Sequence, residues 1–78
     1  MGSRQQNERK FPHWHELPQG GRRYTREVRG HCGWVARYLK EVDAEETTLK
    51  FWQEIYDANG QLVEVHEKYP VDKGHRKV

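Results

Sequence analysis

Hydrophobic and aromatic residues occur along this chain in four short runs that alternate with turn-forming residues. The runs cover residues 23–29, 34–42, 48–57 and 61–69, and the separators cover residues 31–33, 43–47 and 58–60. Runs of this length, rich in β-branched and aromatic side chains and joined by short connections, are typical of sequential strands linked by hairpins. The fold class we expect is therefore mainly β, a four-stranded antiparallel meander.

The segments on either side of these runs predict a disordered start, an arm and a tail. Residues 1–10 are polar and aperiodic, which is typical of disorder. Residues 11–21 contain two prolines and a glycine pair, which disfavour a helix, yet they also carry three large apolar side chains. The expected organisation is a disordered segment at 1–10, an extended N-terminal arm at 11–21, a β-meander domain at 22–70 and a basic C-terminal tail at 71–78.

The run at 48–57 has a helical alternative. Asp43 and Glu46 have the spacing of a capping box, which would open a helix over the run that follows. Against this stands the β-branched and aromatic content of the run, which leads directly into a hairpin signal. We predict a strand here, and a short helical turn at 43–46 is compatible with either structure.

The last hairpin can adopt one of two registers. A two-residue turn would place Ile55 opposite Glu64. A three-residue loop closed by Gly60 in the left-handed region would instead place Ile55 opposite Val63. The second register collects the apolar residues of both strands on one side of the sheet, so we predict the three-residue loop.

In this register both sides of the predicted sheet carry large aromatic side chains. Trp52 lies opposite His66, and Lys50 lies opposite Lys68, on the side away from the apolar set. No predicted helix covers either side, so we expect the N-terminal arm together with a protein partner or a homodimer to cover them. The candidate binding residues are Trp34, Tyr38, Trp52, Tyr56, Arg26 and Arg37.

The net charge of +2 conceals a segregation of charge along the chain. Residues 1–40 contain nine lysines and arginines against three acidic residues, whereas residues 41–67 contain one lysine against eight acidic residues. Residues 68–78 contain four basic side chains against one aspartate. Neutralisation within the sheet is one interpretation. The other is a basic patch that binds phosphate, which makes RNA a further expected partner.

Composition narrows the class of protein. The chain has 78 residues, of which 33% are hydrophobic and 33% charged, so it forms one small domain with little material for a core. The single cysteine, Cys32, excludes an intramolecular disulfide and is typical of a reducing compartment. No apolar run approaches the roughly 20 residues that span a bilayer, so we expect a cytoplasmic protein without membrane contact.

The histidines and the cysteine are candidate metal ligands, and two of them are a candidate catalytic pair. His13 and His15, with His31 or Cys32, contain the donor atoms that zinc prefers. Their spacing matches no recognised zinc motif, so we expect no metal site and no cofactor. Cys32 and His31 are a poor candidate for a catalytic nucleophile with its general base, because neighbouring residues of a strand point to opposite sides.

The C-terminal run at 64–77 is the densest in potential chemistry. One imidazole can take the proton of a 2′-hydroxyl, a second can protonate the leaving oxygen, and a cation can stabilise the charge on phosphorus. The simpler interpretation is an edge strand followed by a solvated basic tail. The candidate catalytic residues for metal-independent RNA cleavage are His66, His75, Lys68 and Arg76.

Four segments resemble a small bacterial domain of unknown function. They are Gly-Gly-Arg-Arg-Tyr at 20–24, Ala-Arg-Tyr at 36–38, Gln-Glu-Ile-Tyr-Asp-x-x-Gly at 53–60 and Glu-Val-His-Glu-Lys-Tyr-Pro-Val-Asp-Lys-Gly-His at 64–75. More distantly, a β-meander with an Asp-, Gly- and His-rich tail is similar to small toxins of bacterial toxin–antitoxin modules. This likeness implies RNA as substrate and a protein as partner, with His66, His75 and Arg76 as the residues to test.

Three functions follow from these observations. The leading interpretation is a protein-interaction module that acts through an aromatic sheet face. The first alternative is a metal-independent ribonuclease toxin of a toxin–antitoxin module. The second alternative is a non-catalytic module that binds RNA or phosphate.

Overall fold

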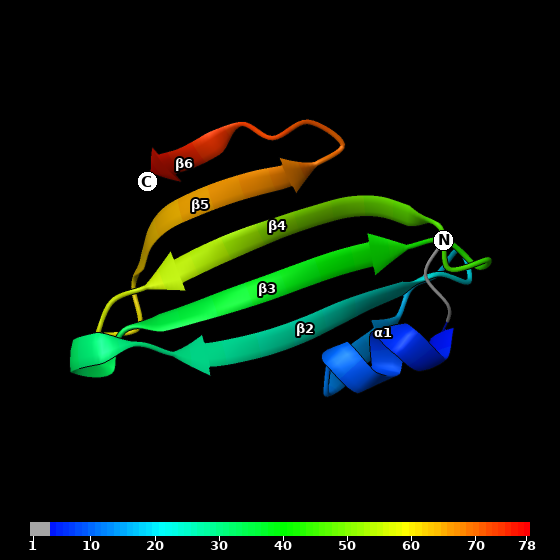
Figure 1. The fold of residues 1–78 in the computed structure, drawn as a ribbon, viewed down its shortest axis with the longest axis horizontal. Helices are drawn as coiled ribbons and strands as arrows, with labels where there is room; N and C mark the ends of the chain where they lie inside the picture. The colour runs from blue at the N-terminus through cyan, green and yellow to red at the C-terminus, as the bar shows by residue number, and fades with distance from the viewer. Residues whose placement is uncertain (1–3) are drawn as a thin grey trace.

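The chain folds as a single antiparallel sheet preceded by a short helix, in a computed structural model that describes residues 4–78. The strands pair in the order β1-β2-β3-β4-β5-β6, so each pairs with its neighbours along the chain (Figure 1). The predicted antiparallel sheet is confirmed, but it has six strands and not four. The elements are α1 (Arg4–Lys10), β1 (His13–Glu16), β2 (Arg22–Arg29), the 3-10 turn η1 (His31–Gly33), β3 (Val35–Val42), β4 (Thr48–Tyr56), β5 (Leu62–Tyr69) and β6 (Gly74–Lys77).

The two additional strands are short and lie at the edges of the sheet. β1 forms within the predicted arm and pairs with β2 along its whole length. β6 forms within the predicted tail and pairs with β5. A four-residue strand has too few alternating positions to be recognised from the sequence, because its stability comes from the ladder with its neighbour. Pro12 and Pro18 both lie outside β1, so neither removes a hydrogen bond from this ladder.

Residues 4–10 form α1, although the sequence predicted disorder there; residues 1–3 of that segment lie outside the described residues. A helix of seven residues is marginal in water by itself, which is why its sequence gives no clear signal. The sheet stabilises it. The side chain of Asn7 on α1 is buried, and Phe11, which follows the helix, packs in the core with Tyr24 of β2.

The third predicted strand is β4, and the helical alternative for this run is wrong. The loops at 17–21, 43–47 and 57–61 share one geometry. In each five-residue loop, the N–H of the first residue donates to the carbonyl of the fifth, and the N–H of the fourth residue donates to the carbonyl of the first. The fourth residue lies in the left-handed region, as predicted for Gly60, with a φ of 79°. In the loop at 43–47 that position is held by Glu46, with a φ of 65°.

The register of the last hairpin agrees with the prediction at the loop but not along the strands. Tyr56 pairs with Leu62, as the three-residue loop requires. An irregularity at the next pair then brings Ile55 opposite Glu64, so the predicted pairing of Ile55 with Val63 is wrong. Bulges of this kind add one residue to one strand and depend on the twist of the whole sheet, which the local sequence does not report.

This shift separates residues that the sequence placed together. His66 pairs with Gln53, and Trp52 pairs with Glu67 instead of His66. The predicted pairing of two lysines across these strands is wrong for the same reason. Because side chains alternate between faces, a one-residue shift places His66 and Trp52 on opposite sides of the sheet.

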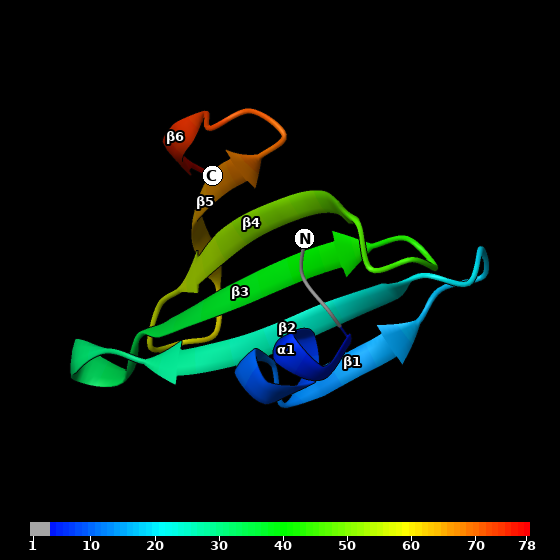
Figure 2. The same ribbon diagram turned by 45° about the vertical axis from the view of Figure 1, so that its right-hand side comes forward.

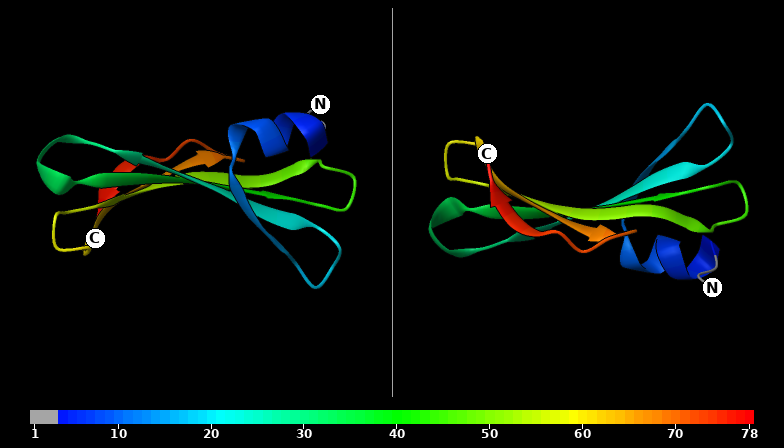
Figure 3. Two further views of the ribbon diagram at one scale, coloured as in Figure 1. Left: turned by 90° about the horizontal axis from the view of Figure 1, so that it is seen from below. Right: turned by 90° about the horizontal axis from the view of Figure 1, so that it is seen from above.

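The two faces of the sheet differ because α1 lies on only one of them (Figure 3). The helix lies beside β2 (Figure 2), so the prediction that no helix covers either side is wrong for part of one face. The helix-bearing face carries Tyr24, Arg26, Tyr38, Phe51, His66 and Lys68. The open face carries Arg37, Leu39, Trp52, Glu54, Tyr56 and Val65.

The hydrophobic core is small and lies between α1 and the sheet. Phe11, Tyr24 and Val42 are buried, and Tyr38 and Phe51 pack against them. The low hydrophobic fraction of the chain accounts for this size, so few side chains hold the fold together. None of the helical segments formed by residues 4–78 is long and apolar enough to cross a membrane.

Candidate functional site

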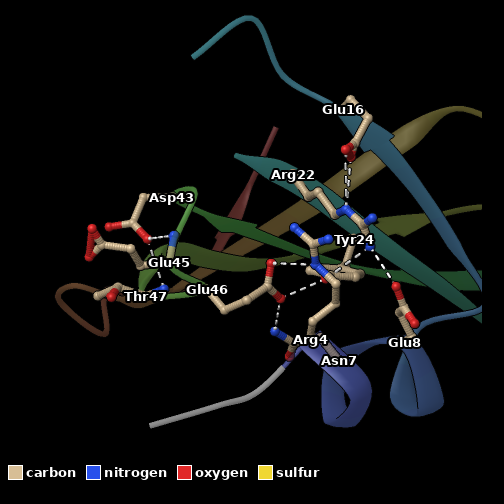
Figure 4. Close-up of polar contacts among 10 residues, drawn as sticks. All are labelled: Arg4, Asn7, Glu8, Glu16, Arg22, Tyr24, Asp43, Glu45, Glu46 and Thr47. Carbon is tan, nitrogen blue, oxygen red and sulfur yellow. Dashed lines mark hydrogen bonds and ion pairs between the residues drawn. The ribbon is translucent and has the colours of Figure 1, made fainter. Parts of the chain in front are cut away.

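A buried polar cluster fixes α1 to the sheet (Figure 4). At its centre, Oε1 of Glu46 accepts hydrogen bonds from Asn7 Nδ2 at 3.0 Å and from the Tyr24 hydroxyl at 2.7 Å. Asn7 comes from α1, Tyr24 from β2 and Glu46 from the β3–β4 loop. Glu46 occupies the left-handed position that Gly60 occupies in the matching loop. The contacts of its carboxylate offset the backbone strain of that position.

Charged side chains reinforce this cluster. Arg22 donates to Glu8 of α1 at 2.7 Å and to Glu16 of β1 at 2.8 Å, so it links both elements to β2. The hydrogen bond with Glu8 raises the pKa of Arg22 above its ordinary value, against the effect of burial. Burial alone would raise the pKa of Glu46, but its hydrogen bonds and the nearby arginines lower it below its ordinary value. Glu46 is therefore ionised at neutral pH.

A pocket of about 390 Å³ opens where α1 ends against the sheet. Its lining combines two lysines, two threonines and three aromatic side chains, and therefore offers cations and hydroxyl groups above an apolar floor. The lining residues are Lys10, Phe11, Lys40, Thr47, Thr48, Phe51 and Tyr69. The position of α1, and hence the buried cluster around Glu46, brings Lys10 and Phe11 to this pocket.

Lys40 is the most enclosed cation of the pocket. Its Nζ donates to Oδ1 of Asn7 at 2.9 Å, which is a neutral acceptor. Burial lowers the pKa of Lys40, and the charge of Lys10 lowers it further, against a smaller opposing effect of Glu46. Two positive charges therefore oppose one another at this site, and an anion bound between them would relieve the repulsion.

Beyond the pocket, further cations of the helix-bearing face lie over aromatic rings. Lys68 Nζ lies 5.6 Å from the ring centre of Phe51 and 5.2 Å from that of Tyr38, and the Arg26 guanidinium lies 5.3 Å from the Tyr38 ring. None of the ion pairs formed within residues 4–78 includes these cations or those of the pocket. We call the four together the cationic strip: Lys10, Arg26, Lys40 and Lys68.

On the open face, two arginines are neutralised by carboxylates. Arg23 lies 2.7 Å from an oxygen of Glu41, and Arg37 lies 2.6 Å from an oxygen of Glu27. Internal neutralisation therefore describes these two arginines, whereas the cationic strip of the helix-bearing face presents positive charge to solvent.

Next to the cationic strip, two histidines meet across β5 and β6. Nδ1 of His66 lies 3.1 Å from Nε2 of His75. The outer nitrogens face carboxylates: His66 Nε2 lies 2.6 Å from Asp72 Oδ1, and His75 Nδ1 lies 3.2 Å from Glu64 Oε1. Asp72 Oδ1 also accepts the N–H of Gly74 at 2.9 Å. We call His66 and His75 the histidine pair.

The contacts of the histidine pair form one continuous chain of polar groups, which runs from Asp72 through His66 and His75 to Glu64. The hydrogen bond from His66 and that from the Gly74 N–H lower the pKa of Asp72, which is consistent with its ionised state.

The predicted catalytic residues are only partly brought together. His66 and His75 are in contact, and Lys68 lies on the same face, two residues along β5. Arg76 pairs with Val65, whose side chain belongs to the open face, so Arg76 points away from the histidine pair.

The predicted binding residues do not form one aromatic face. Tyr38 and Arg26 are on the helix-bearing face. Trp52 and Tyr56 are on the open face, where both donate hydrogen bonds to Glu54, and Arg37 lies over the Tyr56 ring. Trp34 lies beyond both, between η1 and β3, and is 42% exposed.

Sequence reasoning missed Glu64 and Asp72 beside the histidines, and Lys10 and Lys40 at the pocket. The two acids lie in the same run at 64–77 as the histidines, and their proximity in sequence was the available signal. Lys10 carries no such signal, because it reaches the pocket only through the tertiary contacts of α1.

The fold and site define a small β-meander with a cationic, aromatic face and an adjoining histidine pair. No group of three or more His, Cys, Asp or Glu side chains within residues 4–78 is placed to hold a metal ion. Comparison with known proteins found no matching family model, no matching curated protein and no matching solved structure.

Proposed function

We propose that the protein binds single-stranded RNA through the helix-bearing face. The observation that supports this is the cationic strip, because none of its four side chains forms an ion pair with a carboxylate within residues 4–78, in contrast to Arg23 and Arg37 on the open face. Phosphate groups are the natural partners of such charges, and each contact releases counterions from the nucleic acid.

The pocket supports a single strand in preference to a duplex. Phe51 and Tyr69 offer rings to unpaired bases, and Lys10 and Lys40 lie beside them for the adjoining phosphates. The bases of a duplex are stacked on one another and would not reach these rings. Lys68, over Phe51, continues the path of positive charge toward the histidine pair.

A matched pair of lysine variants tests this proposal. We expect Lys68→Gln to weaken binding of a fluorescent single-stranded RNA by about threefold to tenfold, and to reduce the salt dependence of log K by about 0.7. Lys50→Gln is the control, because Lys50 also lies over a ring, that of Trp52 at 4.8 Å, but on the open face. Fluorescence anisotropy over a series of salt concentrations measures both effects.

Equal behaviour of the two variants would contradict the proposal. The earlier interpretation, a protein partner or a homodimer on an aromatic face, would then gain support if light scattering showed a dimer that Trp52→Ala disrupts. Trp52 is suited to that comparison because it lies on the face that α1 does not cover.

The histidine pair favours a second candidate function, metal-independent cleavage of the bound RNA. Cleavage requires one unprotonated imidazole as base and one protonated imidazole as acid. His66 and His75 lie in contact, so one imidazole is available for each role. Each ring is also oriented by a carboxylate at its outer nitrogen, His66 by Asp72 and His75 by Glu64. In the present arrangement the inner nitrogens bind one another, so the substrate must separate the rings to reach them.

Histidine variants test cleavage. We expect a labelled, unstructured RNA to be cut in the presence of EDTA to a product with a 2′,3′-cyclic phosphate, and His66→Ala or His75→Ala to slow this by about 100-fold or more. Arg76→Ala should leave the rate nearly unchanged, since Arg76 lies on the open face. Circular dichroism checks that each variant is folded. Cleavage that survives both histidine substitutions would exclude this candidate and leave RNA binding untouched.

A further inference from the structure

The arrangement around the histidine pair matches that of imidazoles which ligate a metal ion. A ligating histidine binds the metal through one nitrogen and donates its other N–H to a carboxylate or carbonyl. His66 and His75 direct their inner nitrogens toward one another and hold a carboxylate at each outer nitrogen. We propose that His66 Nδ1 and His75 Nε2 form a two-histidine site for a divalent metal ion that prefers imidazole, of the class of Zn²⁺, Ni²⁺ and Cu²⁺.

The orientation of the two rings supports such a site. The carboxylates occupy the outer nitrogens, at 2.6 Å from His66 Nε2 and 3.2 Å from His75 Nδ1. The nitrogens that remain for a ligand are the inner pair, which lie 3.1 Å apart. A metal ion bound to both inner nitrogens would leave both outer contacts in place.

The separation of the two nitrogens is suitable for a shared metal ion. Zinc–imidazole bonds are about 2.0–2.1 Å long. An ion at that distance from both nitrogens, which lie 3.1 Å apart, would subtend an angle of about 100° between them. This lies between the octahedral and tetrahedral values. The rings are tilted by 54° with their centres 4.3 Å apart, so they do not stack face to face.

Neighbouring groups orient the His66 ring and leave the gap between the two rings accessible to solvent. Asp72 is itself held by the Gly74 N–H at 2.9 Å, so the β5–β6 loop fixes the carboxylate that orients His66. The side chain of His75 is 43% exposed, which leaves solvent a path to the gap. With no third protein ligand in place within residues 4–78, water completes the coordination, and the expected affinity is that of a two-ligand site.

A second pair of histidines in the chain serves as a control for metal binding. His13 and His15 alternate along β1 on the same side and are exposed, so they offer two imidazoles without the carboxylates that orient the histidine pair. Neither forms an ion pair with a carboxylate within the described part of the chain. Non-specific capture of metal by surface histidines should depend on these residues.

Titration of the full chain with Zn²⁺ or Ni²⁺ alone, followed by calorimetry, tests the site. We expect one ion per chain. Binding should be lost in His66→Ala and in His75→Ala and retained in a variant with both His13→Ala and His15→Ala. Asp72→Asn, which keeps the fold and both ligands, should weaken binding by about tenfold to 100-fold. NMR of the imidazole protons should show the same two rings shifting with added Zn²⁺.

Two results would overturn the inference. One is the absence of binding at millimolar metal by the folded wild-type chain. The other is binding that survives His66→Ala and His75→Ala but disappears in the variant that lacks His13 and His15. Because the cationic strip does not take part, RNA binding is measured separately and stands or falls independently.

Discussion

Replacing Gly21 with alanine is expected to destabilise the protein by about 3 kcal/mol or more, which is a large fraction of the stability of a domain this small. A Cβ at this position would lie 2.1 Å from the carbonyl oxygen of Val42 and 3.1 Å from the Cα of Asp43. Both are backbone atoms of β3 and of the loop that follows, so neither can move aside as a flexible side chain would. Urea unfolding monitored by tryptophan fluorescence gives the free energy.

Gly30→Ala is the matched control for this experiment. The nearest atom to its added Cβ is the carbonyl oxygen of Trp34 at 3.5 Å, an ordinary contact, and its φ of −103° suits any residue. Its stability should be unchanged or higher by a few tenths of a kcal/mol, because alanine restricts the unfolded chain. Similar losses in both variants would show that the close approach of β2 and β3 at Gly21 is not what limits the substitution.

The strands could be predicted because their signals are local. β-Branched and aromatic content marked β2 to β5, and Asp57 with Gly60 marked the last loop, where the side chain of Asp57 accepts two backbone N–H groups. The same reasoning could not find α1. Its seven residues are stabilised by contacts with Arg22, Lys40 and Glu46, each 14 or more residues away from its partner on the helix.

The candidate site was predicted as a set of residues but not as an arrangement. The irregularity beside Ile55 moves His66 and Lys68 to the face of Tyr38 and Phe51, away from Trp52. A single residue of slip therefore decides which aromatic side chains lie on the face of the histidines. The twist of the sheet sets such a shift, and composition and periodicity do not contain it.

Glu46 shows a similar limit. Its spacing from Asp43 was typical of a helix start, yet Asp43 instead caps a tight loop by accepting the N–H groups of Glu45 and Thr47. The carboxylate of Glu46 is directed into the core, where Asn7 and Tyr24 bind it. The function of such a residue depends on partners that only the folded chain supplies.

Tyr24 contributes to stability, and by holding α1 in place it also supports the proposed RNA-binding surface. Its side chain is 0% exposed, and its ring contacts Phe11 and Trp14 at centroid distances of 5.8 Å and 6.0 Å. We expect Tyr24→Ala to lower the free energy of unfolding by about 3–5 kcal/mol, because it removes the largest side chain of a small core. Tyr24→Phe should cost about 1–2 kcal/mol, since the hydroxyl's contacts with Glu46 and Arg22 are lost while Asn7 still binds the Glu46 carboxylate.

The Tyr24→Phe variant also separates the contribution of α1 to stability from its contribution to RNA binding. If it stays folded and keeps the helix in place, Lys10 and Lys40 remain at the pocket and RNA binding should be close to that of the wild type. Chemical denaturation and anisotropy on the same samples measure stability and binding together. A variant that loses RNA binding while its unfolding free energy barely changes would show that the Tyr24 hydroxyl contributes to the binding surface. The role of Tyr24 as a buried anchor for α1 would then be wrong.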